Sequence, residues 1–139
     1  MKLLGINHVG LAPKDPKMAK WFFGEALESD YLGEEFVMEQ KTNTHIFKTD
    51  TESKISLVEI LEERGGGDGP IGKYIEKRGG GIHHVALDVD DIEAFIARLL
   101  SKGVIMIDKV PRQGVCQTKI AFVHPKSTGG LLVELVERQ

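Results

Sequence analysis

The feature that most constrains the fold of this chain is an internal repeat. Residues 6–15 (INHVGLAPKD) and 82–91 (IHHVALDVDD) align without gaps at an offset of 76 and share Ile, His, Val, Leu and a final Asp. In each copy an extended apolar segment leads into a helix start, because Asp15 and Asp91 are good N-cap residues and Pro16 suits a first helical position. A repeat of this kind predicts two similar structural modules.

Strand-like segments follow each predicted helix, so each module is expected to read β-α-β-β-β. The predicted strands after the two helices are 31–39, 42–48 and 54–61 in the first module and 104–107, 117–123 and 131–136 in the second. We therefore expect an α+β fold in which each module curves half of a cleft. The expected organisation is a single domain over residues 1–139, with modules at about 3–62 and 81–137 joined by a linker and short helix at 63–80.

Composition excludes several classes of protein. The chain has 18 Lys and Arg against 21 Asp and Glu, a net charge of −3, which argues against a nucleic-acid surface. No apolar run is long enough to span a membrane, and the first residues lack the features of a signal or transit peptide. The single cysteine, Cys116, cannot form an intrachain disulfide. A reduced, cytoplasmic compartment is the expectation.

The repeat also selects candidate ligands, because equivalent positions of two duplicated modules are expected to face each other. His8 is equivalent to His84. Ser56-Leu57-Val58-Glu59 resembles Glu134-Leu135-Val136-Glu137 at an offset of 78, which makes Ser56 the equivalent of Glu134. Two imidazoles and one carboxylate with open positions are typical of a catalytic site for Zn, Co, Mn, Fe or Ni.

The alternative is that these side chains are ordinary core residues. A single His in an apolar strand is more often that than a ligand, but a second His at the repeated position weakens this interpretation. Glu134 lies in a strongly apolar strand, where a carboxylate is costly to bury unless it is paired or bound to metal. The metal site is the favoured interpretation.

The repeat with its His, His and Glu resembles the vicinal oxygen chelate superfamily, which includes glyoxalase I. More narrowly, the chain resembles the methylmalonyl-CoA epimerases. This likeness spans nearly the whole chain and rests on four segments: residues 6–10 (INHVG), 70–79 (PIGKYIEKRG), 81–92 (GIHHVALDVDDI) and 124–130 (HPKSTGG) with Glu134 beyond them.

The resemblance implies a metal site formed by His8, His84 and Glu134, with Ser56 at the position where many relatives have a Gln or Glu ligand. It implies a divalent cofactor such as Co, Mn, Zn or Ni, an acyl-CoA substrate and a homodimer. The implied reaction is epimerisation of methylmalonyl-CoA, in which the metal stabilises an enolate and Glu134 is one acid or base. His45, Glu39 and a metal-bound water are candidates for the other, and the loop with Lys126 and Ser127 is expected to help shape the acyl-CoA pocket.

Two other functions stay open from the sequence. The same fold could carry out a glyoxalase-like lyase or a ring-cleaving dioxygenase reaction, although HPKSTGG argues against both. A small-molecule binding protein of this fold is the non-enzymatic alternative, and the presence of all three predicted ligands argues against it.

Overall fold

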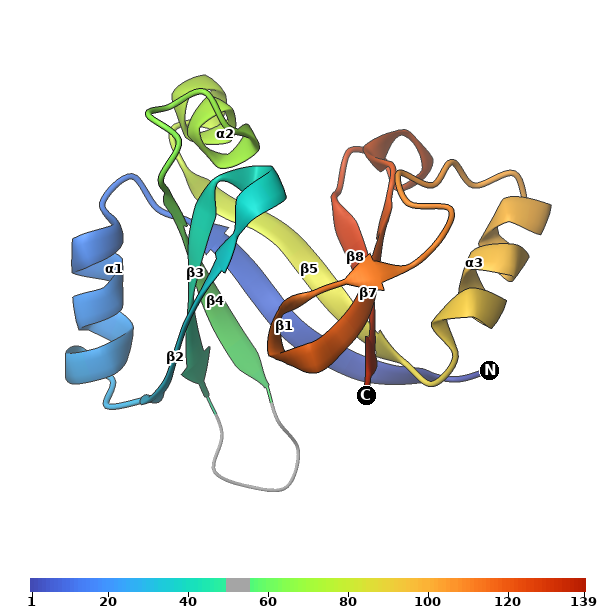
Figure 1. The fold of residues 1–139 in the computed structure, drawn as a ribbon, viewed down its shortest axis with the longest axis horizontal. Coiled ribbons are helices and arrows are strands. Elements are labelled where there is room, and N and C mark those ends of the chain that lie inside the picture. The colour runs from blue at the N-terminus through green and yellow to red at the C-terminus, as the bar shows by residue number, and fades with distance from the viewer. Residues whose placement is uncertain (50–55) are drawn as a thin grey trace. The chain divides into compact units, whose positions relative to one another are not determined.

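A computed structural model describes residues 1–49 and 56–139 of the chain, which form two compact units (Figure 1). The first unit is His8–His83, and the second unit is Met1–Asn7 together with His84–Gln139. The two strands that begin the repeats, β1 (Leu3–Ala12) and β5 (Gly81–Val89), each contribute residues to both units. The amino-terminal residues therefore belong with the second half of the sequence.

The first unit contains a four-stranded sheet with strand order β2-β3-β4-β1. Its β1 and β4 strands pair in parallel, and the other neighbours are antiparallel. After β1 come α1 (Pro16–Trp21), a π-helical turn (Phe22–Ala26), β2 (Asp30–Val37), β3 (Thr42–Lys48), β4 (Leu57–Glu63) and α2 (Pro70–Arg78). The predicted cap holds, since the Asp15 carboxylate accepts a hydrogen bond from the Met18 amide at 3.0 Å.

Helix α1 covers one face of this sheet (Figure 1). Phe23, in the turn after α1, packs on Phe47 of β3 with ring centroids 6.1 Å apart. Lys20 of α1 forms an ion pair with Glu62 of β4 at 3.7 Å. Residues alternate between the two faces of a strand, so the side chains of His8 and Glu59 lie on the opposite face, away from α1.

The second unit repeats this arrangement with strand order β5-β8-β7-β6. After β5 come α3 (Ile92–Ser101), β6 (Arg112–Gln113), β7 (Thr118–Val123) and β8 (Val133–Arg138). The Asp91 carboxylate caps α3 through the Ala94 amide at 3.0 Å. The start of β1 is held to this unit by hydrogen bonds from the Lys2 amide to Asp90 and from Asn7 to Asp88, at 2.7 and 2.9 Å.

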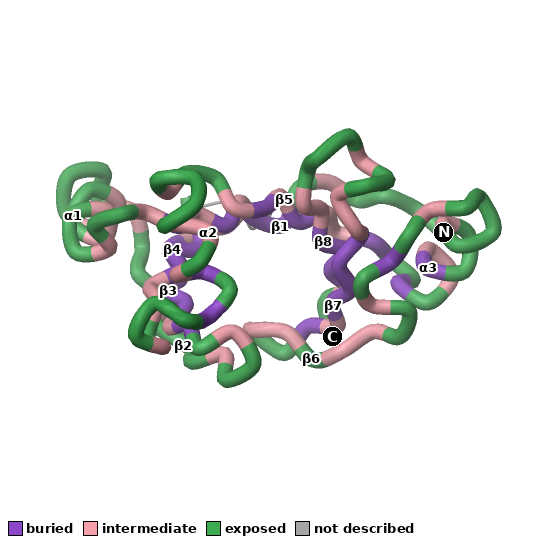
Figure 2. The backbone as a smooth tube through the Cα atoms, turned by 90° about the horizontal axis from the view of Figure 1, so that it is seen from above, coloured by how far each residue is buried: buried purple, intermediate pink, exposed green. Residues whose placement is uncertain are grey.

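The buried residues of the second unit form two clusters, one on each face of its sheet. Helix α3 buries Ile92 and Ile96 against Ala121 and Leu135. On the other face Ala86, Ile120, Phe122 and Val136 pack together. Figure 2 shows the buried stretches of β7 and β8, between the exposed turns of this unit.

The predicted βαβββ order is confirmed in both units, but one predicted strand is wrong. Residues 104–107 form only an isolated bridge, between Met106 and Val123, and the strand lies instead at Arg112–Gln113. The cause is Asp108. Its carboxylate accepts a hydrogen bond from the Phe122 amide at 2.8 Å, in place of a main-chain carbonyl from a strand paired with β7. Pro111 then delays pairing, because it has no N–H to donate.

The third predicted strand of the first module is displaced toward the carboxyl end. Its first two residues, 54 and 55, lie outside the described residues, and β4 covers Leu57–Glu63 where 54–61 was expected. Among the described residues, no helix combines the length and apolar character needed to cross a bilayer.

Candidate metal centre

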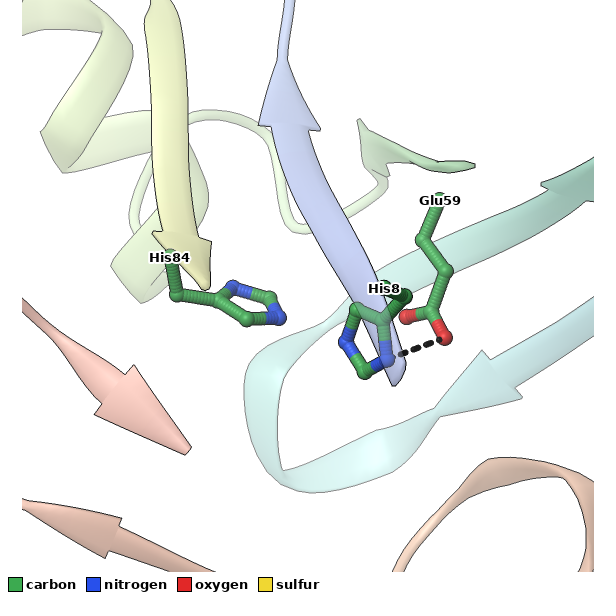
Figure 3. Close-up of side chains that lie close together, drawn as sticks. All are labelled: His8, Glu59 and His84. Carbon is green, nitrogen blue, oxygen red and sulfur yellow. Dashed lines mark ion pairs between the residues drawn. The ribbon is translucent and has the colours of Figure 1, made fainter. Parts of the chain in front are cut away.

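The first unit holds a buried imidazole next to a buried carboxylate. His8 of β1 and Glu59 of β4 are each 4% exposed, and His8 Nδ1 lies 3.3 Å from Glu59 Oε2 (Figure 3). Parallel pairing places them together, because Gly10 is the partner of Glu59 and His8 is the partner of Leu57. Both side chains therefore project from one face of adjacent strands.

The second unit contains a matching pair. His84 of β5 and Glu134 of β8 are buried, and His84 Nε2 lies 3.3 Å from Glu134 Oε1. Here Ala86 is the partner of Glu134 in the parallel β5–β8 ladder. The His84 ring stands edge-on to Phe122 with centroids 5.6 Å apart, which restricts its orientation.

The two ladders show that Glu59, not Ser56, is the equivalent of Glu134. Gly10 and Ala86 each lie two residues after the repeated His, and they pair with Glu59 and Glu134 respectively. The predicted offset of 78 was therefore wrong by three residues. Ser56 precedes β4, and its carbonyl oxygen accepts hydrogen bonds from the amide and hydroxyl of Thr49, both at 2.9 Å.

A signal for Glu59 was present in the sequence. Glu59-Ile60-Leu61-Glu62 matches Glu134-Leu135-Val136-Glu137 at an offset of 75, with a carboxylate at each end of both segments. The offset of 78 matched only one of the two carboxylates. An alignment that matched the carboxylates, which are costly to bury, would have made Glu59 the equivalent of Glu134. The alignment at an offset of 78 followed the apolar residues between them.

The structure separates each proposed ligand of the second unit from its neighbouring candidate. His83 projects away from His84 and packs edge-on against Tyr74 with centroids 5.0 Å apart. Glu137 lies on the α3 side of its sheet, where it accepts a hydrogen bond from the Ile92 amide at 2.9 Å. Neither side chain shares the face of the His84–Glu134 pair.

His45 lies on the face of the first sheet that α1 covers, so it does not share a face with His8 and Glu59. It is buried, and its Nε2 lies 2.7 Å from Glu62 Oε1. Burial tends to raise the pKa of the Glu62 carboxyl, but the His45 hydrogen bond and the charges of Lys20 and Arg64 outweigh it, so the pKa lies below its usual value. This cluster therefore joins the strands to α1.

The remaining predicted residues lie at exposed turns or in local hydrogen bonds. Glu39 is exposed in the turn Met38–Gln40 after β2. In the HPKSTGG loop, the Lys126 amide donates to His124 Nδ1 at 3.0 Å, and the Ser127 hydroxyl accepts from the Ile105 amide at 2.9 Å. These bonds define the shape of the loop.

Both pairs have the chemistry of a metal site. Carboxylates buried beside imidazoles in apolar strands require a counter-charge or a ligand role. His8, Glu59 and His84 each offer a buried ligand atom for a cation. Imidazole nitrogen with carboxylate oxygen suits Zn and neighbouring divalent transition metals. The donor set therefore fits a divalent cation.

Comparison with known proteins agrees with this fold and with these site residues. The family model described as the Glyoxalase/Bleomycin resistance protein/Dioxygenase superfamily matches residues 7–122. The chain belongs to this superfamily, as the repeat and its His and Glu residues predicted.

Within it, the chain is similar to methylmalonyl-CoA epimerases. It is 35% identical over 136 residues to the ethylmalonyl-CoA/methylmalonyl-CoA epimerase of Cereibacter sphaeroides, covering 94% of this chain and 95% of the relative. A solved methylmalonyl-CoA epimerase in complex with methylmalonyl-CoA and NH4+ superposes with a TM-score of 0.90 at 31% identity, covering 99% and 96% of the two chains. The uncharacterized protein YqjC of Bacillus subtilis is 36% identical over 132 residues, covering 95% of this chain and 91% of its own.

Proposed function

We propose that this protein is a metal-dependent epimerase that interconverts the two C2 epimers of methylmalonyl-CoA. The observation that carries the proposal is the pair of equivalent, buried His–Glu contacts, one in each unit. The epimerases among its relatives support the choice of substrate. A buried ligand set also favours an enzyme over a binding protein that has lost its metal.

The proposed metal ligands are His8, Glu59, His84 and Glu134. Three of them were predicted from the sequence, and Glu59 takes the place that Ser56 was expected to fill. Co, Mn, Zn and Ni are all compatible with two imidazoles and two carboxylates. A bound divalent ion would act as a Lewis acid that lowers the energy of negative charge developing on the thioester oxygen.

The proposed proton transfers use the two carboxylates. The hydrogen between a thioester carbonyl and a carboxylate is weakly acidic, and inversion needs one group to remove it and another to return a proton on the other face. Glu134 is the proposed base for one face. Glu59 is its equivalent in the other unit and is the proposed partner, since His45 shares a face with neither His8 nor Glu59.

Three further expectations belong to this proposal. The HPKSTGG loop, shaped by the hydrogen bonds of Lys126 and Ser127, contributes to the acyl-CoA pocket. The protein functions as a homodimer. It works in a reduced, cytoplasmic compartment, consistent with one exposed cysteine.

A substrate panel with the metal-loaded protein tests the proposed function. One C2 epimer of methylmalonyl-CoA, a glyoxalase I substrate and a catechol are each incubated with the protein, and the products are resolved chromatographically. We expect the methylmalonyl-CoA epimers to equilibrate and the other compounds to be unchanged. Turnover of only one of the other two compounds would show that the protein is a lyase or a dioxygenase and not an epimerase. Turnover of none of the three would favour a binding protein.

A further inference from the structure

A guanidinium group lies on the same face of the second sheet as the His84–Glu134 pair. Arg112 of β6 pairs with Ile120 of β7, and Phe122, two residues further along β7, pairs with Glu134. The Arg112 guanidinium carbon lies 5.6 Å from the centre of the Phe122 ring, the same ring that contacts His84. The Phe122 ring thus contacts both the guanidinium and His84, and Phe122 is the ladder partner of the proposed base, Glu134.

Asp108 orients this guanidinium. Its Oδ1 accepts from Arg112 Nε at 3.1 Å, while its Oδ2 accepts from the Phe122 amide at 2.8 Å. The carboxylate therefore links the arginine to the backbone of β7 at the residue opposite Glu134. A guanidinium held in this way loses less conformational entropy when it binds a ligand.

We infer that Arg112 binds the free carboxylate of the thioester substrate. This inference rests on the proposed function, since it assumes a substrate that carries a carboxylate next to the reacting carbon. A guanidinium matches a carboxylate geometrically and forms charge-assisted hydrogen bonds with it. The Arg112 side chain is 34% exposed, so an incoming anion can reach it.

The position of Arg112 favours the substrate carboxylate over a phosphate of the CoA portion. In a malonyl-type thioester, the carboxylate is attached to the carbon that loses its proton. A group that recognises it must therefore lie beside the proton-transfer residues, as Arg112 lies beside the Phe122–Glu134 pair. The phosphates of CoA are many bonds away from that carbon.

The experiment measures equilibrium binding of methylmalonyl-CoA and of propionyl-CoA, which lacks the carboxylate, by calorimetry on metal-loaded protein. The variants are Arg112→Gln, Arg112→Lys and the control Lys119→Gln. Lys119 is a matched control, because it lies on the same strand pair and is 37% exposed, but its Nζ faces Glu93 and Glu137 on the α3 side.

We expect Arg112→Gln to weaken methylmalonyl-CoA binding by about ten- to hundredfold, as for a lost hydrogen bond between charged groups. Propionyl-CoA binding should be unchanged. Arg112→Lys should give an intermediate loss, and Lys119→Gln should match the wild type for both thioesters. Unfolding temperatures of all variants confirm that each one is folded.

Equal weakening for both thioesters would overturn the inference and assign Arg112 to a CoA phosphate, and no change for either would also overturn it. If the selective loss is found but the wild type does not epimerise methylmalonyl-CoA, the inference about Arg112 stands and the proposed function fails. If the wild type binds methylmalonyl-CoA no better than propionyl-CoA, the inference about Arg112 fails, and the epimerisation assay alone decides the proposed function.

Discussion

At the scale of single residues, the central feature is a carboxylate buried beside an imidazole, found once in each unit. Glu59 and Glu134 lie in apolar strands with His8 and His84 as neighbours at 3.3 Å. Leaving such a group without a partner is costly, because the charge has lost its water. A bound cation would neutralise such a carboxylate, which gives these residues a reason to be buried at all.

Replacing Glu134 separates its two proposed roles. Glu134→Gln keeps an oxygen that can bind a cation but removes the group that accepts a proton. We expect turnover to fall by about 10²–10⁴-fold, the usual contribution of a positioned base, while metal content changes much less. The rate of solvent-deuterium incorporation and elemental analysis measure the two effects. Wild-type exchange by Glu134→Gln would show that this carboxylate is not the base.

Replacing Glu59 tests the register correction. Glu59→Ala should lower metal affinity by at least about tenfold, the lower end of the loss seen even for residues that only support a ligand. Ser56→Ala should leave it unchanged, because the described contacts of Ser56 come from its carbonyl oxygen. Metal titration of both variants provides the comparison. A larger loss for Ser56→Ala than for Glu59→Ala would restore the original assignment.

At the scale of helices and strands, local features such as helix caps were predicted well from the sequence. The pairing of strands that are distant in the sequence was predicted poorly. The caps at Asp15 and Asp91 form as expected, because capping depends on residues three positions apart. The register of β4 could not be read from its apolar residues, since Leu57, Val58, Ile60 and Leu61 fit either face.

The missed strand β6 has a different cause. Residues 104–107 have the composition of a strand. However, the Phe122 amide, which would donate to such a strand, donates its hydrogen bond to the Asp108 carboxylate. A side chain that takes over a main-chain hydrogen bond leaves no periodic pattern in the sequence. The other oxygen of the Asp108 carboxylate accepts from Arg112 Nε and orients a side chain that the sequence did not identify as a candidate.

The cluster that joins β3, β4 and α1 should make stability depend on pH. The folded pKa of Glu62 lies below its ordinary value of 4.5, so its charged form stabilises the fold above that pH. This contribution should disappear as pH falls through the lowered pKa. We expect Glu62→Gln to reduce the free energy of unfolding at pH 7 and to match the wild type in strong acid.

Chemical denaturation of both proteins across this pH range measures the difference. Glu76→Gln, at an exposed position of α2, is the matched control. A constant difference between wild type and Glu62→Gln down to the lowest pH would contradict the role assigned to the Glu62 charge.

At the scale of the whole molecule, we propose that residues 1–139 act as one domain although they form two compact units. The strands β1 and β5 each pass from one unit into the other, and the second unit is built from two separate stretches of the chain. Each unit contains one buried His–Glu pair among the residues proposed to bind metal.

Removal of the metal should destabilise the folded protein. A ligand that binds only the folded state raises its stability by mass action, so the stripped protein should unfold at a lower temperature in a single transition. Calorimetry before and after chelation, with metal loss verified by elemental analysis, measures this shift. An unchanged unfolding temperature would argue against a metal held by His8, Glu59, His84 and Glu134.

The central claim is that a metal bound by these residues supports proton exchange at C2 of methylmalonyl-CoA. The most direct measurement is mass-spectrometric detection of deuterium incorporated at C2 in D₂O, with metal-loaded, chelated and reloaded protein. We predict incorporation with the loaded protein, none above background after chelation, and recovery with cobalt or manganese. Exchange at the full rate after verified metal loss, or no exchange by the loaded protein, would contradict the account.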